Sequence, residues 1–327
     1  MKKKVIILGS TGSVGTQALE VIESSSELEV VALAAHSNAE LLTKQAAQFN
    51  VKHTALAAQD DISEFVKNTT ADIVLNAISG AAGLEPTLAA IESGKDVALA
   101  NKETLVVAGE QVMKAARDRG VQIIPVDSEH AALHQALQNI SPDLIHCLIL
   151  TCSGGPFYGR SRQDLEQVTP TQALAHPTWE MGPKISIDSA TLVNKGFEII
   201  EAHHLFGLPY DQIKVRIHPQ SKVHGIIQLK DGNSILVASE TDMKIAIHYA
   251  LYYPHRQPTN LPHLDFDESW TFTKPTSEPL EGIELGYQAG RANKGAEFVA
   301  ANDAAVQDFL DKKISFLQIY EQIKSEI

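Results

Sequence analysis

Short apolar runs alternate with amphipathic stretches along the first 150 residues. The run VIIL (5–8) predicts a buried strand, and the stretch GTQALEVI after it predicts a helix with Ala18, Leu19 and Ile22 on one side. Further apolar runs follow at intervals, in VVALAAHSN, ADIVLNAISG, KDVALANKETLV and VQIIPVDSE. This alternation predicts an α/β domain with a parallel sheet.

The pattern changes after residue 150. The run LILTCSGGPF predicts a strand that breaks at Ser153, and KVRIHPQSKVHGIIQLKDGNSILVASE predicts antiparallel strands. Asp231-Gly232 or Gly232-Asn233 would form their hairpin turn. We expect the chain to be helical from about residue 280.

The segment ISIDSATLVNKGFEIIEAHHLFG (185–207) predicts a helix that ends near Gly207. Asp188 or Ser189 would cap its start, because their side chains can accept hydrogen bonds from backbone N–H groups. Its expected buried stripe consists of Val193, Phe197 and Ile200.

Three glycines follow the first predicted strand with the spacing G-x-x-G-x-x-G, at Gly9, Gly12 and Gly15. This is a variant of the dinucleotide-binding pattern, in which the backbone approaches a pyrophosphate at a helix N-terminus. A purely structural turn is the alternative. The second predicted strand ends in His36-Ser37-Asn38 without an acid, which favours NADP over NAD, although a plain surface loop has the same composition.

Two carboxylates, Asp127 and Glu129, follow the buried run IIPV one residue apart. In an extended chain their side chains would leave the backbone on the same side and repel each other unless a cation lay between them. A hard divalent cation would fit. The alternative is a solvated strand end followed by a helix N-terminus, where acids are also favourable. Lys102 follows the fourth predicted strand and would share this sheet edge, as a site residue or as a structural ion-pair partner.

Polar side chains on the predicted helix at 185–207 suggest a second group of site residues. Glu198 is four positions after Asn194 and three after Lys195, so the three side chains project from neighbouring positions on one face. Together with Ser189 they offer a hydroxyl, an amide and an ammonium group to a phosphate, and a carboxylate to a metal. A surface ion pair between Lys195 and Glu198 is the alternative.

Two loops could complete such a site. The turn Ser153-Gly154-Gly155 has N–H groups that could hold an anion, or it is an ordinary strand exit. The segment HPTWEMGPK (176–184) resembles a lid with its own apolar cover, or a long loop anchored by a buried tryptophan. His218 and His224 are expected to be packing or interface residues, because strands of this kind often build a dimer sheet.

Gross composition limits the function classes. A chain of 327 residues predicts two or three domains, and a net charge of −13 argues against a nucleic-acid surface. The sequence has no apolar run of membrane-spanning length, and its start, MKKKVIILGS, leads into glycines rather than a cleavage site. Cys147 and Cys152 are too few for a disulfide framework, so we expect a reducing cytoplasm.

Together these segments resemble the 1-deoxy-D-xylulose 5-phosphate reductoisomerase family from residue 4 to about residue 312. The resemblance rests on GSTGSVG, ANKETLV, PVDSEH, SGGPF, HPTWEMGPKISIDSATLVNKGFEIIEA and IHPQSKVHG, in the family's order. It implies a Rossmann-like NADPH-binding domain (1–150), an α+β catalytic and dimerisation domain with a lid loop (151–275), and a helical C-terminal region (276–327).

The resemblance also implies roles for individual residues. The family's divalent cation, Mg²⁺ or Mn²⁺, would be held by Asp127, Glu129 and Glu198. NADPH would lie along Thr11, Gly12, Ser13, Val14, Ser37, Asn38, Asn101 and Glu103, with Gly182 near the nicotinamide. The substrate, 1-deoxy-D-xylulose 5-phosphate, would contact Lys102, Ser128, Glu129, Ser153, His176, Trp179, Ser189, Asn194, Lys195 and Glu198. The resemblance assigns catalytic roles to Lys102, Asp127, Glu129, His176 and Glu198.

The implied reaction cleaves and re-forms a carbon–carbon bond, and hydride from NADPH then gives 2-C-methyl-D-erythritol 4-phosphate for non-mevalonate isoprenoid synthesis. The sequence departs from the family at DMKIAI (242–247), which lacks a proline, and at VAAND (299–303). Family members also usually continue into further C-terminal helices. A homodimer is expected from the resemblance alone.

Two other functions remain open at this stage. One is a different metal-using NADP oxidoreductase, although Arg160, Arg162 and Arg216 form no cluster of the kind that binds a second carboxylate. The other is a non-catalytic relative that keeps the fold as a binding or scaffolding protein. The intact acids at 127, 129 and 198 argue against it.

Overall fold

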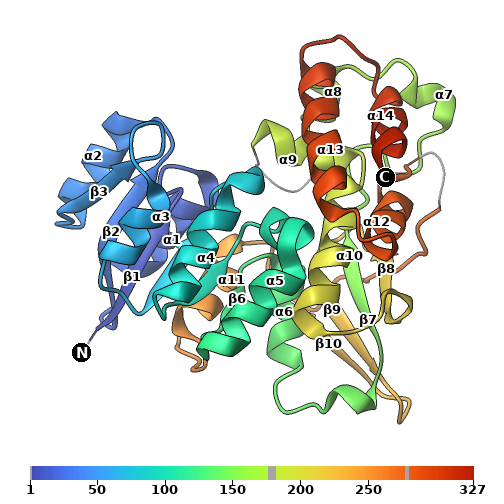
Figure 1. The fold of residues 1–327 in the computed structure, drawn as a ribbon. Helices are drawn as coiled ribbons and strands as arrows, with labels where there is room; N and C mark the ends of the chain where they lie inside the picture. The colour runs from blue at the N-terminus through green and yellow to red at the C-terminus, as the bar shows by residue number, and fades with distance from the viewer. Residues whose placement is uncertain (1, 176–181, 277–279) are drawn as a thin grey trace. The chain divides into compact units, whose positions relative to one another are not determined.

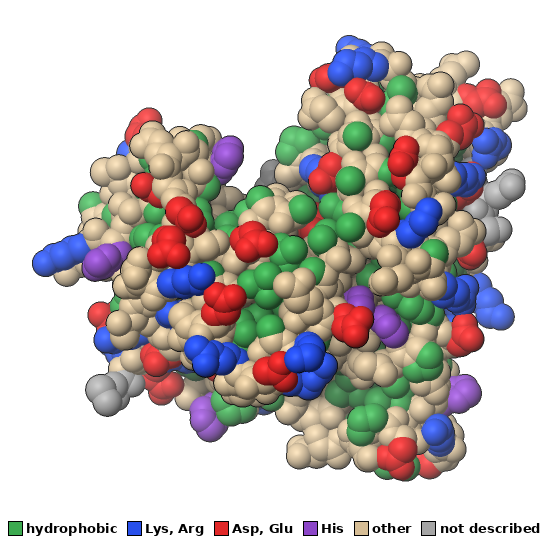
Figure 2. All heavy atoms as spheres, viewed as in Figure 1, with side chains coloured by type: hydrophobic (Ala, Val, Ile, Leu, Met, Phe, Trp, Pro, Cys, Tyr) green, Lys and Arg blue, Asp and Glu red, His purple; other side chains and the backbone are tan. Residues whose placement is uncertain are grey.

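A computed structural model describes residues 2–175, 182–276 and 280–327. The chain forms two compact units, of which the first comprises Met1–Ala131 and Asp242–Leu261 and the second Ala132–Thr241 and Pro262–Ile327. Helix α6 (Ser128–Ala136) crosses from the first unit into the second. Figure 1 shows the elements of both units. Acidic and basic side chains are interspersed on the face drawn in Figure 2.

The first unit is built on a parallel sheet. Among its described residues the strand order is β3-β2-β1-β4-β5-β6, and every pairing is parallel. The strands are β1 (Lys3–Leu8), β2 (Leu28–Ala35), β3 (His53–Leu56), β4 (Ile73–Asn76), β5 (Asp96–Leu99) and β6 (Ile123–Pro125). This is the strand order of dinucleotide-binding folds, in which ligands bind at the carboxyl ends of the strands.

Helices cover both faces of this sheet (Figure 1). They are α1 (Ser13–Glu23), α2 (Ala39–Gln48), α3 (Ile62–Asn68), the 3₁₀ turn η1 (Gly80–Gly83), α4 (Leu84–Glu92) and α5 (Glu103–Arg119). Ala18, Leu19 and Ile22 of α1 are buried against the sheet, as the apolar spacing predicts. Because the central strands are covered on both sides, they consist almost wholly of buried aliphatic residues.

A later segment returns to the first unit. Helix α11 (Met243–Tyr252) packs against α1 and contributes Ile247, Ala250 and Leu251 to the same core. Lys3 Nζ donates to the carbonyl of Leu251 at 3.0 Å. The first compact unit is therefore discontinuous along the chain.

The second unit has a mixed sheet with the strand order β10-β9-β7-β8. Its strands are β7 (Ile145–Cys152), β8 (Ile213–Ile217), β9 (Val223–Leu229) and β10 (Ser234–Ala238). The β9–β10 hairpin turns at Asp231–Asn233, where Gly232 has φ +91° and Asp231 Oδ1 accepts from the Asn233 N–H at 2.9 Å. This confirms the predicted hairpin.

The second unit also contains most of the C-terminal helices. Its elements are η2 (Pro142–Leu144), α7 (Arg162–Leu165), α8 (Pro170–Ala173), α9 (Pro183–Ala190), α10 (Val193–Phe206), η3 (Tyr210–Gln212), α12 (Gly282–Arg291), α13 (Gly295–Leu310) and α14 (Gln318–Glu326). Helix α10 packs against β7, β8 and α12 (Figure 1). The last three helices confirm the helical region expected from about residue 280.

Four local expectations differ from the structure. Strand β3 was not predicted, because only Ala55 of its four residues is buried and it forms the edge of the sheet. Strand β8 pairs in parallel with β7 instead of joining β9 and β10 as an antiparallel strand. The predicted helix at 185–207 is two helices that break at Leu192, whose φ is +58°. Asp188 and Ser189 therefore lie inside α9 and cap no helix start, whereas α10 does end at Gly207.

The two compact units also divide the chain differently from the three predicted ranges. Strand β7 begins before residue 150 but belongs to the mixed sheet of the second unit. The segment 242–261, placed by the sequence in the second domain, belongs to the first unit. Apolar patterns identify elements, but they do not say which unit an element joins.

Candidate active site

The glycine turn after β1 leaves no room for side chains at two of its three glycines. Gly9 has φ +79°, and a Cβ there would lie 2.5 Å from the Ala77 carbonyl oxygen. A Cβ on Gly15 would lie 2.2 Å from the carbonyl oxygen of Gly9. Gly12 is the N-cap of α1 and makes no side-chain cap, so the N-terminus of α1 presents backbone N–H groups beside the turn. The arrangement suits a phosphate anion.

The neighbouring strand tip provides hydroxyl and amide groups. Ser37 and Asn38 follow β2 and are exposed. Asn38 caps α2, because its Oδ1 accepts from the Leu41 N–H at 3.1 Å. Gln45 of α2 donates to the Ser10 carbonyl at 2.8 Å and so ties α2 to the glycine turn. Thr11, Ser13 and Val14 lie on the turn or the first turn of α1.

Asn101 joins the tips of β4 and β5. Its buried Nδ2 donates to the carbonyls of Ile78 at 2.6 Å and Gly80 at 2.8 Å, and its Oδ1 accepts from the Thr104 N–H at 2.9 Å. Glu103 Oε2 lies 3.2 Å from the same Nδ2. Asn101 and Glu103 therefore define the shape of this sheet edge through contacts within the protein.

The paired acids lie where β6 gives way to α6. Asp127 Oδ2 accepts from Lys102 Nζ at 2.7 Å, and both side chains are largely buried. Asp127 Oδ1 accepts from the Ser128 N–H at 3.1 Å, and the Ser128 hydroxyl donates to Glu129. Lysine at this distance offsets the repulsion between the neighbouring carboxylates.

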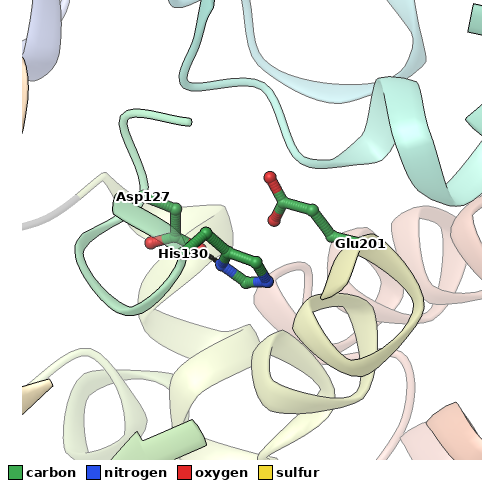
Figure 3. Close-up of side chains that lie close together, drawn as sticks. All are labelled: Asp127, His130 and Glu201. Atoms are coloured by element: carbon green, nitrogen blue, oxygen red, sulfur yellow. Dashed lines mark ion pairs between the residues drawn. The ribbon is translucent and has the colours of Figure 1, made fainter. Parts of the chain in front are cut away.

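The geometric argument from an extended chain was wrong for these acids. Strand β6 ends at Pro125 and Glu129 lies in the first turn of α6, so the two residues do not alternate along one strand. The sharp strand-to-helix turn brings them together instead. His130 Nδ1 lies 3.4 Å from Asp127 Oδ2 (Figure 3), a contact that the sequence analysis missed although the PVDSEH motif contains the histidine.

In the second unit, helix α10 carries a polar trio, Asn194, Lys195 and Glu198. Asn194 Nδ2 donates to Glu198 Oε1 at 2.6 Å, and Lys195 Nζ donates to Glu198 Oε2. Lys195 and Glu198 are 2% and 1% exposed, so this is a buried pair rather than the surface pair weighed as an alternative. One turn further on, α10 carries the buried Glu201, which is also drawn in Figure 3.

Two further site residues of the second unit lie on segments that pack closely. Ser153 follows β7, and its Oγ accepts from the Gly155 N–H at 3.2 Å. A Cβ on Gly155, which has φ +70°, would lie 2.7 Å from the Ser189 carbonyl oxygen, so the Ser153 turn approaches α9 closely. Gly182 is the N-cap of α9. His176 and Trp179 lie outside the described residues.

Comparison with known proteins decides among the functions left open. Sequence models of 1-deoxy-D-xylulose 5-phosphate reductoisomerase match residues 5–64 and 50–109, and models of its C-terminal domains match 123–206 and 238–327. The enzyme of that name from Leifsonia xyli is 49% identical over 328 residues, covering 98% of this chain and 90% of the relative. The chain belongs to the 1-deoxy-D-xylulose 5-phosphate reductoisomerase family.

Other members of the reductoisomerase family agree in sequence and in structure. The Thermoanaerobacter sp. (strain X514) enzyme is 45% identical over 350 residues, covering 99% of this chain and 92% of the relative. The Zymomonas mobilis enzyme in complex with NADPH matches with TM-score 0.91 at 36% identity, covering 99% of this chain and 91% of the other. A reductoisomerase in complex with NADPH, fosmidomycin and magnesium matches with TM-score 0.92 at 35% identity, covering 99% and 88%.

Membership in the reductoisomerase family assigns the reaction. The chain is an NADPH-dependent, metal-using oxidoreductase that rearranges and reduces 1-deoxy-D-xylulose 5-phosphate in isoprenoid precursor synthesis. No helix among the described residues is both long enough and apolar enough to cross a membrane. Membership in the family excludes the two alternatives, an unrelated NADP oxidoreductase and a non-catalytic scaffold.

Proposed function

We propose that the residues predicted from the sequence perform the family reaction in this chain, with the cofactor on the first unit. The support is the steric demand at Gly9 and Gly15, where side chains would collide with backbone, and the N-terminus of α1 beside them. NADPH would lie along Thr11, Gly12, Ser13 and Val14, pass Ser37 and Asn38, and reach Asn101 and Glu103. Gly182 would lie near the nicotinamide, which supplies the hydride.

Asp127, Glu129 and Glu198 would hold the divalent cation. Each offers a carboxylate, and carboxylates are the hard oxygen donors that suit Mg²⁺ or Mn²⁺. When bound, the cation supplies Lewis acidity toward the ketone and the neighbouring hydroxyl of the substrate. Lys102 Nζ donates to Asp127 Oδ2 at 2.7 Å and so orients this carboxylate.

The substrate phosphate would be held by Ser153, Ser189, Asn194 and Lys195. The Ser153 turn packs against the backbone of Ser189, and Lys195 is a buried cation on the next helix. Binding the phosphate away from the reacting carbons supplies energy for orienting the substrate. Ser128 and Lys102 would contact its polar groups, and His176 and Trp179 would cover it.

With these contacts, the chain's own residues would orient the sugar and exclude water. A carbon–carbon bond of the sugar breaks and re-forms, and the product of this rearrangement is a branched aldehyde. Reduction of that aldehyde gives 2-C-methyl-D-erythritol 4-phosphate. Glu129, whose carboxylate accepts from the Ser128 hydroxyl, would exchange a proton with a hydroxyl of the substrate. The segment 176–184, interpreted from the sequence as a lid, would keep water from the aldehyde.

We also propose a cytoplasmic homodimer. The support is the edge strand β10, which carries the 45% exposed Leu236, and the exposed aromatic Phe266 of the same unit. An exposed apolar edge strand is a ready surface for a second copy. Cys147 and Cys152, which are too few for a disulfide framework, agree with a reducing compartment.

The reaction itself is tested by following NADPH absorbance with 1-deoxy-D-xylulose 5-phosphate in the presence of Mg²⁺. We expect oxidation of one NADPH per product, loss of turnover with a chelator, and recovery when Mg²⁺ or Mn²⁺ is added back. The unphosphorylated sugar is the matched control and should be turned over far more slowly. Equal rates with and without chelator would contradict the metal assignment.

A further inference from the structure

A buried carboxylate on α9 has no part in the reaction described so far. Asp188 is 2% exposed and lies one residue before Ser189. Its Oδ2 accepts from Lys184 Nζ at 2.6 Å, one turn earlier on the same helix. Burying a carboxylate is costly unless charge and hydrogen bonds satisfy it, so its partners fix where this part of α9 can lie.

The second oxygen of Asp188 is held from a distant part of the chain. Asn302 of α13 is fully buried, and its Nδ2 donates to Asp188 Oδ1 at 2.8 Å. The next residue, Asp303, lies 3.2 Å from Lys184 Nζ through its Oδ1. Two consecutive residues of α13 thus hold both members of the Lys184–Asp188 pair.

The same short helix meets the phosphate-binding segments. The backbone carbonyl of Ser189 is in such close approach to Gly155 that no Cβ fits there, so a shift of α9 would move the Ser153 turn as well. At the C-cap of α9, the Thr191 carbonyl accepts from Tyr320 of α14 at 3.1 Å. Helices α13 and α14 therefore hold α9 at Asp188 and at Thr191, which lie on either side of Ser189.

We propose that Asn302 is a positioning residue for substrate binding: its amide fixes Asp188 and thereby the turn of α9 from which Ser189 reaches the phosphate. This inference rests on the proposed assignment of Ser189 to the phosphate. Asn302 touches neither substrate nor cofactor in this scheme. Its effect passes through one hydrogen bond to a charged group, which is stronger than a bond between neutral groups.

The test replaces Asn302 by leucine, which keeps the approximate size but removes the donor. In Asn302→Leu we expect KM for 1-deoxy-D-xylulose 5-phosphate to rise about tenfold, on the scale of one charge-assisted hydrogen bond. We expect kcat to stay within about threefold and KM for NADPH to stay unchanged, because Asp188 and Ser189 lie at the phosphate end of α9 and Gly182 caps its opposite end. The matched control is Tyr287→Phe, which removes a hydrogen bond of 2.7 Å from α12 to the Ile213 carbonyl and should leave all three constants unchanged.

A pair of charge-swapped variants keeps the test valid if the leucine variant does not fold. Asn302→Asp places two carboxylates together and should raise KM further, whereas the double variant Asp188→Asn/Asn302→Asp restores a donor–acceptor pair with its direction reversed. Recovery of KM to within about threefold of the unsubstituted enzyme supports positioning. No recovery in the double variant, or a melting temperature that falls while KM stays constant, overturns it.

The outcomes separate this inference from the proposed function. Lack of NADPH oxidation by the unsubstituted chain would contradict the reaction itself. A normal KM for the sugar phosphate in Ser189→Ala would contradict the phosphate assignment. A raised KM in Ser189→Ala with a normal KM in Asn302→Leu would leave the phosphate site standing and overturn only the role of Asn302.

Discussion

The glycine turn of the first unit and the polar trio of α10 in the second unit are built in opposite ways. At the glycine turn, the absence of side chains shapes the backbone, and Gly9 and Gly15 lie against main-chain atoms. In the trio, Lys195 and Glu198 are buried and Asn194 is half-buried, and both Asn194 and Lys195 donate hydrogen bonds to the Glu198 carboxylate. The first arrangement is sensitive to added volume and the second to removed charge.

This difference explains why the glycine turn can be predicted from neighbouring residues in the sequence, whereas the environment of the trio cannot. A glycine spacing after a strand describes a backbone shape within seven residues. A trio at i, i+1 and i+4 describes a helix face, but burial decides whether it is a surface ion pair of little energy or a costly internal pair. Substitutions in the glycine turn should therefore lower the free energy of unfolding, whereas removal of charge from the trio should lower turnover.

The largest effect is expected in the trio. Glu198→Gln removes the charge of a proposed metal ligand, and we expect turnover to fall by roughly 10³-fold or more, the scale on which transition-state charge stabilisation is lost. Glutamine keeps the size and an acceptor for Lys195, so the helix should stay folded. Steady-state kinetics and circular dichroism measure the two effects.

The affinity for NADPH is the internal control for Glu198→Gln, because all the proposed cofactor contacts except Gly182 are on the first unit. It should stay within about twofold of the unsubstituted value. Near-normal turnover with a folded protein would remove Glu198 from the metal site.

An intermediate effect is expected in the glycine turn. In Gly15→Ala the new Cβ would lie 2.2 Å from the Gly9 carbonyl, so backbone must move, and the free energy of unfolding should fall by about 1–3 kcal/mol. Gly12→Ala is the matched control, since its Cβ would lie 3.3 Å from the same oxygen and only a small adjustment is needed. Urea unfolding without cofactor measures both. Equal losses in the two variants would contradict the steric account.

The smallest effect is expected at the far end of the trio's own helix. Burial lowers the pKa of His204 to about 4, with a smaller contribution from His203. Between pH 6.5 and pH 4 the unfolded chain binds a proton that the folded chain does not, so the free energy of unfolding falls as the pH decreases through this range. His204→Gln should flatten this dependence by a fraction of the ~1.4 kcal/mol per pH unit that one proton allows, because the ring is partly exposed.

The control for His204→Gln is His255→Gln, which replaces an exposed histidine in the first unit. Its urea-unfolding curves between pH 4 and pH 7 should match those of the unsubstituted protein. Identical pH slopes for all three proteins would show that the His204 ring is not held neutral by the fold.

Periodic patterns predicted much of the fold because they act over short distances. The α1 helix, the β9–β10 hairpin and the buried stripe of α10 all follow from local spacing. The break at Leu192 was not predictable, because a leucine with φ +58° between two helices is imposed by packing rather than preferred by the residue. The edge strand β3 was missed because three of its four residues are not buried.

The candidate site was predictable in its residue types but less so in its contacts. Lys102 and Asp127 were expected at one sheet edge, and the structure joins them at 2.7 Å. The link between Asn302 and Asp188 spans 114 positions, and no spacing rule relates residues so far apart. The one sequence feature noted around Asn302 was that VAAND (299–303) departs from the family.

The sequence by itself determined most of the elements, the glycine turn and the chemical groups available for an NADPH- and metal-dependent reaction, because these depend on neighbours a few residues apart. Tertiary structure decided that β7 pairs in parallel with β8, that 242–261 rejoins the first unit, and that Lys195 and Glu198 are buried. Burial and pairing depend on contacts between residues distant along the chain. The same residues can therefore be a solvated ion pair or a functional cluster, and the packing around them decides which.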